Sequence, residues 1–152
     1  MSSISPGSVS TDRYLTFSLG TEDFAIPLLQ VKEVIALTEV TPVPQTPAYF
    51  LGIMNLRGQV ITVLDLRTKM SIKPKANQET VVIICDLKPL CVGIVVDAVN
   101  SVLPMSAEQI SPKPDLTGSK NDSITGVYQD EKNLILILDI AKTLNLTDQA
   151  FV

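Results

Sequence analysis

The sequence predicts an all-β protein built as two small antiparallel β-barrels. Three features lead to this fold class: a repeated strand pattern, apolar runs rich in β-branched residues, and proline-bearing loops between the runs. With 152 residues, the chain is long enough for one compact domain or two small lobes. Apolar residues make up 45% of the chain and aromatic residues only 5%, so we expect a core of valine, isoleucine and leucine.

An internal repeat defines the predicted architecture. The segment "GIMNLRGQVITVLDLRTKM", starting at Gly52, aligns without a gap with "GVYQDEKNLILILDIAKTL", starting at Gly126, at an offset of 74 residues (126 − 52). Each copy predicts two strands joined by a turn, then an aspartate and a short helix. A weaker match aligns "LTFSLGTEDFAIPLL" from Leu15 with "VVIICDLKPLCVGIV" from Val81, at an offset of 66 (81 − 15). Each half of the chain therefore follows the order hairpin, loop, hairpin, short helix.

The strand predictions rest on alternation of apolar residues. In "QVITVLDL", Val60, Thr62, Leu64 and Leu66 share one face, and Ile61 and Val63 take the other. The runs "TVVIIC" and "LILILDI" are apolar on both faces, which is typical of a strand enclosed by its own barrel or by a neighbouring lobe. The stretch "LLQVKEVI" from Leu28 has a pattern that allows a turn or two of helix.

The remaining segments read as caps, loops and tails. Asp65 and Asp139 stand where a strand gives way to a helix, which favours a role as helix caps. Prolines predict an extended connector at 42–47 and a long loop at 104–122. We expect a first lobe at about 14–72 and a second at about 79–147, joined by a linker at 71–78. The ends, 1–11 and 148–152, are predicted to be tails, the first of them disordered.

Composition excludes several classes of function. The chain has no histidine, so it has no imidazole base, no histidine metal ligand and no phosphohistidine. A net charge of −4 without a dense basic tract argues against nucleic-acid binding, and no glycine-rich nucleotide motif is present. Neither a signal peptide nor a long apolar run is found, which predicts a cytoplasmic protein. Cys85 and Cys91 flank a predicted turn that would place them nearly opposite each other, and we interpret them as core thiols. No cofactor or metal is predicted.

One enzymatic alternative uses the carboxylates Asp65, Asp97 and Asp139 of a small β-barrel hydrolase. It requires the three side chains to cluster in one cleft. Two of them occupy equivalent positions of the repeat and are better explained as caps. Asp97 follows an apolar strand and is interpreted as the acceptor of a structural hydrogen bond. We therefore do not expect an enzyme.

Arg57 is the position at which the two copies differ most informatively. The first copy has "LRG" at Leu56 to Gly58, where the second has "DEK" at 130–132. Because the same turn carries the opposite charge in the second copy, the fold does not require Arg57. Gly58 has a structural explanation, since a tight hairpin favours a residue that tolerates positive φ. Arg57 is thus either a solvated turn residue or a contact with a partner.

The combined motifs resemble the CheW family of bacterial chemotaxis coupling proteins. The resemblance covers about Asp12 to Thr147 and rests on "FAIPLLQVKEVI", "TPVPQTPAYFLGIMNLRGQVITVLDLR", "CVGIVVDAVNSVL" and "ITGVYQDEKNLILILDI". It implies two intertwined five-stranded SH3-like β-barrels with short helices. It also implies an adaptor at receptor arrays that binds the regulatory domain of the histidine kinase CheA and the cytoplasmic tip of chemoreceptors, and that meets the membrane only through those receptors.

The resemblance also implies two sets of contact residues. Receptor binding falls on Arg57 and on an interlobe groove that includes Val81 and Val102. Kinase binding falls on Val31, Glu33 and Gly52 in the first lobe. The alternative is a CheW-like regulatory module of another chemosensory or motility system.

Overall fold

The computed structural model describes residues 11–73, 80–87, 91–112, 124–130 and 133–144. Most of the predicted tails and of the linker therefore lie outside the described residues, although Thr11, predicted to belong to the first tail, begins the first strand. The structure is all-β, as predicted, and its strands form two sheets.

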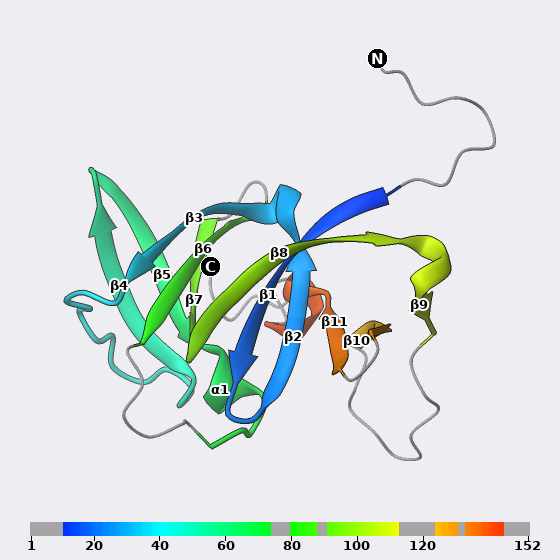
Figure 1. The fold of residues 1–152 in the computed structure, drawn as a ribbon. Helices are drawn as coiled ribbons and strands as arrows, with labels where there is room; N and C mark the ends of the chain where they lie inside the picture. The colour runs from blue at the N-terminus through cyan, green and yellow to red at the C-terminus, as the bar shows by residue number, and fades with distance from the viewer. Residues whose placement is uncertain (1–10, 74–79, 88–90, 113–123, 131–132, 145–152) are drawn as a thin grey trace.

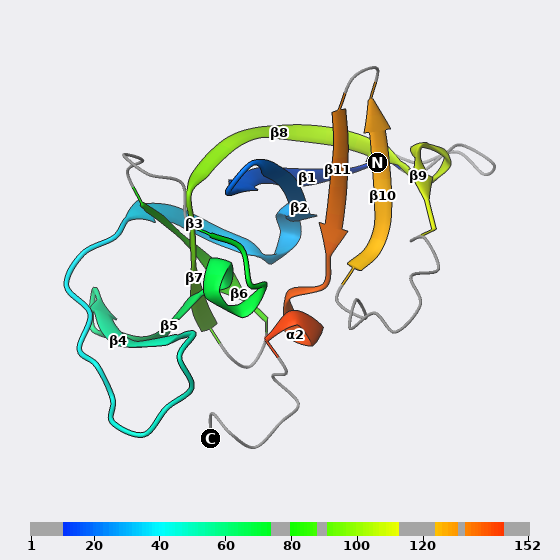
Figure 2. The same ribbon diagram turned by 90° about the horizontal axis from the view of Figure 1, so that it is seen from below.

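Each sheet curls around its own apolar cluster and forms one barrel (Figures 1 and 2). The five-stranded barrel has, in spatial order, β3 (Val31–Ala36), β6 (Val81–Asp86), β7 (Cys91–Val96), β5 (Gln59–Asp65) and β4 (Phe50–Leu56). The second barrel has β8 (Ala98–Ser106), β1 (Thr11–Leu19), β2 (Glu22–Pro27), β11 (Asn133–Leu138), β10 (Ile124–Asp130) and β9 (Ile110–Ser111). It has six strands rather than the predicted five because the two-residue β9 pairs with β10.

The two halves of the chain exchange hairpins, so the barrels are intertwined. The β1–β2 hairpin of the first half joins the second barrel through parallel pairing of β2 with β11. The β6–β7 hairpin of the second half joins the five-stranded barrel through parallel pairing of β7 with β5. The segments at 14–72 and 79–147 are therefore repeated units along the chain, and each barrel combines strands from both.

The repeat predicted from Gly52 and Gly126 recurs in three dimensions. In both copies the register of the hairpin shifts at this glycine, between Phe50 and Gly52 and between Ile124 and Gly126. Helix α1 (Leu66–Lys69) follows β5, and α2 (Ile140–Thr143) follows β11. Asp65 accepts hydrogen bonds from the backbone amides of Arg67 and Thr68, and Asp139 accepts one from Lys142. The predicted caps are confirmed.

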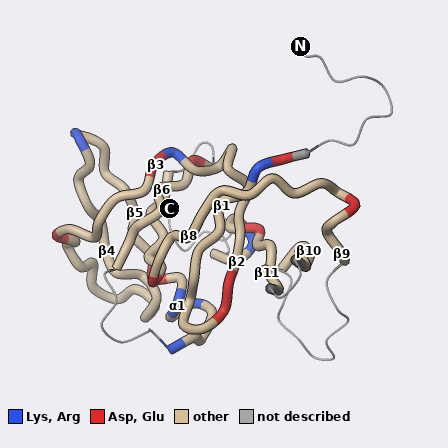
Figure 3. Tube along the Cα trace, in the orientation of Figure 1, with Lys and Arg blue, Asp and Glu red and all other residues tan. Residues whose placement is uncertain are grey.

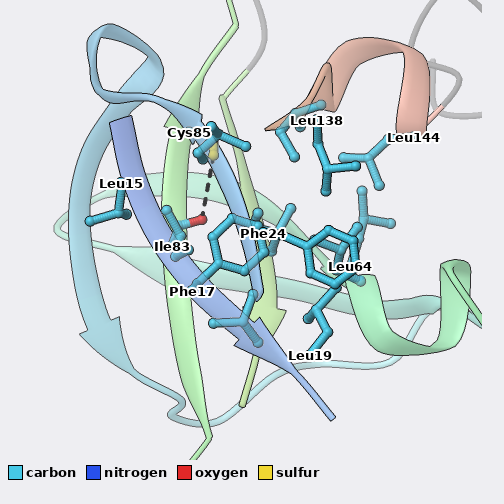
Figure 4. Packing of buried hydrophobic residues seen from close by; sticks show 14 of the residues in the cluster. Leu15, Phe17, Leu19, Phe24, Leu64, Ile83, Cys85, Leu138 and Leu144 are labelled. Atoms are coloured by element: carbon cyan, nitrogen blue, oxygen red, sulfur yellow. Dashed lines mark hydrogen bonds between the residues drawn. The ribbon is translucent and has the colours of Figure 1, made fainter. Parts of the chain in front are cut away.

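A central apolar cluster fills the space between the barrels (Figure 4). Phe17 and Phe24 stack at its centre, with ring centroids 6.1 Å apart. Strand β6 supplies both sides of its sheet, as predicted: Ile83 and Cys85 join this central cluster, while Val82 and Ile84 fill the five-stranded barrel. Side chains that are packed on both faces of a strand explain why "TVVIIC" lacks a polar alternate position.

One local prediction was only partly right and another was wrong. The stretch from Leu28 forms only a 3-10 turn, η1 (Leu28–Gln30), before β3 begins, because alternate residues of β3 face the core and solvent. The predicted loop from Pro104 is strand as far as Ser106, followed by the 3-10 turn η2 (Ala107–Gln109). Pro104 is tolerated because β8 is an edge strand, where a missing backbone donor breaks no ladder.

Candidate functional site

Arg57 occupies the tip of the β4–β5 hairpin. Leu56 and Gln59 are the last pair of the ladder, so Arg57 and Gly58 form a two-residue turn. Both have positive φ, 52° and 89°, the pattern of a type I′ turn. The backbone amide of Gly58 donates to Asn55 Oδ1 at 2.8 Å. An arginine in this conformation costs about 1–2 kcal/mol, which glycine would avoid, so stability of the turn does not explain Arg57.

The guanidinium of Arg57 pairs with Glu33 of β3. The arginine side chain is 67% exposed and that of Glu33 is 27% exposed. Beside this pair, Lys32 Nζ donates to Gln59 Oε1 at 3.4 Å. These contacts join the hairpin tip to β3, the strand at the opposite edge of the five-stranded sheet. The structure therefore brings together Arg57 and Glu33, which the family resemblance assigned to different partners.

The predicted groove residues lie at the margin of the central cluster. Val102 of β8 pairs with Leu15, a member of the cluster, and is 43% exposed. Val81 of β6 is half-buried and packs against the same cluster. Val34 of β3 pairs with Ile83 of the cluster and is 41% exposed. Paired residues share a face of a sheet, so these three valines all lie on the faces between the barrels.

Sequence reasoning missed Val34 because Val31, Val34 and Ile35 all fit its helical interpretation of "LLQVKEVI". The sequence did contain a signal for Val34. In a strand, alternation puts Val34 on one face and its neighbours Glu33 and Ile35 on the other. We call Val34, Val81 and Val102 the interlobe margin.

The predicted kinase residues differ in exposure. Val31 is half-buried against the central cluster, and Glu33 carries the ion pair described above. Gly52 is buried, with φ of +146°. A Cβ atom at Gly52 would lie 2.1 Å from the carbonyl oxygen of Thr41. Thr41 and Ile53 bind each other there by two backbone hydrogen bonds, of 2.8 and 2.9 Å. Gly52 permits this close approach and has no surface of its own.

A buried ionic network joins the two barrels near α1. Arg67 Nε and Nη2 donate to the two carboxylate oxygens of Asp65, at 3.0 and 3.1 Å. Arg67 Nη1 donates to Asp97 at 2.9 Å, and the amide of Gly20 donates to the same carboxylate at 2.6 Å. The hydrogen bond to Asp65, opposed by burial, raises the pKa of Arg67. Since Gly20 lies in the β1–β2 turn, Asp97 links the second barrel to α1.

This network answers the hydrolase alternative. Asp65 and Asp97 do lie together, but Arg67 binds both carboxylates, and the Asp97 side chain is only 1% exposed. Asp139 caps a different helix. The structural hydrogen bond predicted for Asp97 is confirmed, whereas its pairing with Arg67 was not foreseen, because no local pattern connects residues 30 positions apart. Within the described parts of the chain, no three Cys, Asp or Glu side chains gather to hold a metal ion.

Cys85 and Cys91 are free thiols on neighbouring strands. Cys85 pairs with Val92, and Cys91 with Asp86, so the cysteines are one register step apart. Cys85 belongs to the central cluster, while Cys91 packs against the core of the five-stranded barrel. They therefore point to opposite faces of the sheet, which prevents a disulfide. Burial raises the pKa of Cys85 to about 12.

Charged residues are distributed along the described part of the chain rather than gathered in one segment. Lysine, arginine, aspartate and glutamate are interspersed along the described chain (Figure 3). In the same residues, no helix is both long and apolar enough to span a membrane.

Comparisons with known proteins identify the family. Residues 13–148 match the CheW-like domain. The chain is 34% identical over 148 residues to the chemotaxis protein CheW of Klebsiella aerogenes, covering 96% of this chain and 89% of the relative. It is 29% identical to the chemotaxis protein CheW of Helicobacter pylori, covering 87% of this chain and 81% of the relative. The crystal structure of the scaffolding protein TtCheW from Thermoanaerobacter tengcongensis superposes with a TM-score of 0.78 at 30% identity, covering 86% of this chain and 90% of that one. The chain belongs to the CheW-like family and acts as a chemotaxis adaptor.

Proposed function

We propose that this adaptor couples the cytoplasmic tip of chemoreceptors to the regulatory domain of the histidine kinase CheA. The observation that carries the proposal is the interlobe margin. Val34, Val81 and Val102 belong to strand faces that are otherwise buried between the barrels, yet two of them are more than 40% exposed. An apolar stripe on a receptor helix would cover them. The apolar surface buried in this contact would contribute about 25 cal/mol of binding free energy per Å².

Arg57 reaches β3 through Glu33, which directly precedes Val34 in the chain but lies on the opposite face of that strand. An arginine presents five donors in a rigid fork, so it can fix the register of a helix by binding a carboxylate or carbonyl. The energetic cost of its positive φ supports a role outside the fold.

The kinase surface in this proposal is the part of β3 at Val31 and Glu33, both of which are half-buried. Gly52 contributes indirectly, since it holds Thr41 against β4. The Arg57–Glu33 ion pair joins one residue of each proposed surface, so the binding of one partner would alter the other surface. These partners imply a cytoplasmic location at receptor arrays on the inner face of the membrane.

The test is co-sedimentation of the protein with receptor-bearing membranes, with and without CheA. We expect Arg57→Glu to lose receptor binding and to keep kinase binding. Lys73→Glu is the matched control, because it makes the same charge change at an exposed residue outside both proposed surfaces. Unchanged receptor binding by Arg57→Glu would remove Arg57 from the site, and loss of kinase binding alone would move it to the kinase surface.

A double variant separates direct contact from support through the ion pair. Arg57→Glu with Glu33→Arg restores an ion pair but exchanges its charges. We expect receptor binding to remain lost, because the cation is no longer at the hairpin tip. Restored binding would mean that the ion pair, rather than Arg57 itself, is what the receptor needs. Receptor tips from other chemosensory or motility systems, added as competitors, decide which system the adaptor serves.

A further inference from the structure

A polar hollow of about 370 Å³ opens into the six-stranded barrel. It is lined by residues of β1, β2, β8 and β11, which Figure 2 shows side by side around this barrel. The lining residues are Thr16, Ser18, Asp23, Asn100, Ser101, Leu103 and Ile135. Thr16 pairs with Ala25, and both Ala25 and Ile135 belong to the apolar cluster of this barrel. The hollow therefore lies on the inner face of the sheet, where a packed core would be expected.

The internal repeat provides a comparison for this hollow. Thr16 and Ser18 correspond to Val82 and Ile84, 66 positions later. Strand pairing supports the correspondence, because Thr16 pairs with Ser101 and Val82 pairs with Ile35. Val82 and Ile84 are fully buried in the core of the five-stranded barrel, and Ile35 packs against them. The fold thus accommodates an apolar core at these positions, and the second barrel has hydroxyl groups instead.

Asp23 shows the same contrast more sharply. It pairs with Ser18, and the equivalent partner of Ile84 is Gly93. A Cβ atom at Gly93 would lie 2.8 Å from a methyl group of Val82 and 3.3 Å from one of Ile84. In the packed barrel, a side chain at the cross-strand partner of Ile84 would therefore crowd Val82 and Ile84. In the second barrel the cross-strand partner of Ser18 carries a carboxylate, beside the smaller residues Thr16 and Ser18.

The hydrogen bonds of the hollow leave an anionic acceptor exposed to it. Asn100 Nδ2 donates to Ser18 Oγ at 3.0 Å, and Ser18 Oγ donates to Asp23 Oδ1 at 3.1 Å. Ser18 Oγ thus acts as both acceptor and donor, while among the described residues no donor contacts Asp23 Oδ2 and no basic side chain forms an ion pair with Asp23. An ionised carboxylate binds a hydrogen-bonding cation more strongly than a neutral donor.

We propose that this hollow is a binding site for a guanidinium or primary ammonium group, held by Asp23 with Asn100 and Ser101 beside it. The volume of the hollow falls within the range of small-ligand sites. Its hydroxyl oxygens can accept hydrogen bonds from the several N–H groups of a guanidinium or ammonium ion. The proposal does not depend on the partners proposed above, because neither Arg57 nor the interlobe margin contributes to the hollow.

Nuclear magnetic resonance titration of the full chain tests the site. The probes are methylguanidinium and methylammonium, with tetramethylammonium, which donates no hydrogen bond, at equal ionic strength. We expect saturable shifts of the amide signals of Ser18, Asp23 and Asn100 with the first two probes only. Equal shifts with tetramethylammonium, or shifts spread over the surface, would overturn the proposal.

Two variants make the test specific. Asp23→Asn should weaken binding roughly tenfold or more, since it removes a charge-assisted hydrogen bond. Glu22→Gln is the matched control: it makes the same charge change at the exposed neighbouring residue, on the other face of β2, and should leave affinity within about twofold. Ser18→Ile with Asp23→Gly copies the packed barrel and should abolish saturation. If Asp23→Asn binds as the wild type does, the site is not there, whether or not the double variant folds.

The source of the cation is decided by one further pair of probes. Agmatine carries a free guanidinium, and a capped Gly-Arg-Gly peptide carries the same group on a backbone. Binding of the peptide at least as tight as that of agmatine assigns the site to a basic side chain of a protein partner, and exclusion of the peptide assigns it to a small free cation. Binding of neither refutes the proposal.

Discussion

Gly52→Ala separates a structural role of Gly52 from a direct kinase contact. The new Cβ would lie 2.1 Å from the Thr41 carbonyl oxygen, a backbone atom that moves only if the bridge from Thr41 to Ile53 breaks. The φ of +146° adds about 1–3 kcal/mol of backbone strain for alanine. Loss of two backbone hydrogen bonds adds about 0.5–1.5 kcal/mol each. We expect the free energy of unfolding to fall by roughly 2–6 kcal/mol.

Urea denaturation measures this change, and Gly58→Ala is the control. Gly58 also has positive φ, 89°, but a Cβ there would meet no atom within 4 Å, so only the backbone term of about 1–2 kcal/mol applies. If Gly52 has only this structural role, the Gly52→Ala protein should lose kinase binding only to the extent that it is unfolded or that Thr41 is displaced. A Gly52→Ala protein as stable as wild type that nevertheless fails to bind the kinase would refute the reasoning and make Gly52 part of the contact.

Three further predictions concern the buried polar groups and the hairpin. Asp97→Asn should destabilise the fold by about 1.5–3 kcal/mol, because it weakens the hydrogen bond to the charged Arg67. Asp139→Asn changes only a helix N-cap and should cost about 1 kcal/mol or less. The midpoints of urea denaturation compare the two variants. At pH 8, Cys91 should react with a thiol reagent well before Cys85, and equal reactivity of both thiols would contradict this. The free energy of unfolding should also fall as pH rises from about 8.5 towards 12, because the thiol of Cys85 ionises near 8.5 in the unfolded chain but keeps its proton in the folded one. Arg57→Asn should leave stability equal or slightly higher, since Asn-Gly suits a type I′ turn, while receptor binding falls; a marked drop in thermal midpoint would show that the Arg57–Glu33 pair stabilises the hairpin.

Local pattern predicted the hairpins and caps well, because their determinants lie close together in the chain. The β4–β5 turn needs only Gly58 and the flanking alternation, and the caps need only Asp65 and Asp139 ahead of a helix. The exchange of hairpins has no such local determinant. The parallel pairings of β2 with β11 and of β7 with β5 join strands distant in sequence. Only the family resemblance implied that the barrels are intertwined.

The candidate site was predictable to the same extent. Arg57 stood out because the repeat does not require it. The resemblance assigned Val102 and Val81 to a receptor surface, and both lie at the interlobe margin. Alternation could assign Val34 to a strand face but not predict its exposure, and no local signal pointed to the pairing of Arg67. Exposure of Val34 depends on β3 being the last strand of its sheet, and the pairing of Arg67 with Asp97 depends on the path of β7.

Differences between the two copies are the most informative feature of this chain, because both copies satisfy the same fold. Where they agree, as at Asp65 and Asp139, the residue has a structural task in each. Where they differ, the residue in one copy is released from that task. Arg57 takes a positive φ that glycine would adopt with less strain, and Asp23 faces Ser18 where the other barrel pairs Ile84 with a glycine. A polar residue that neither the fold nor the other copy requires is a strong candidate for binding.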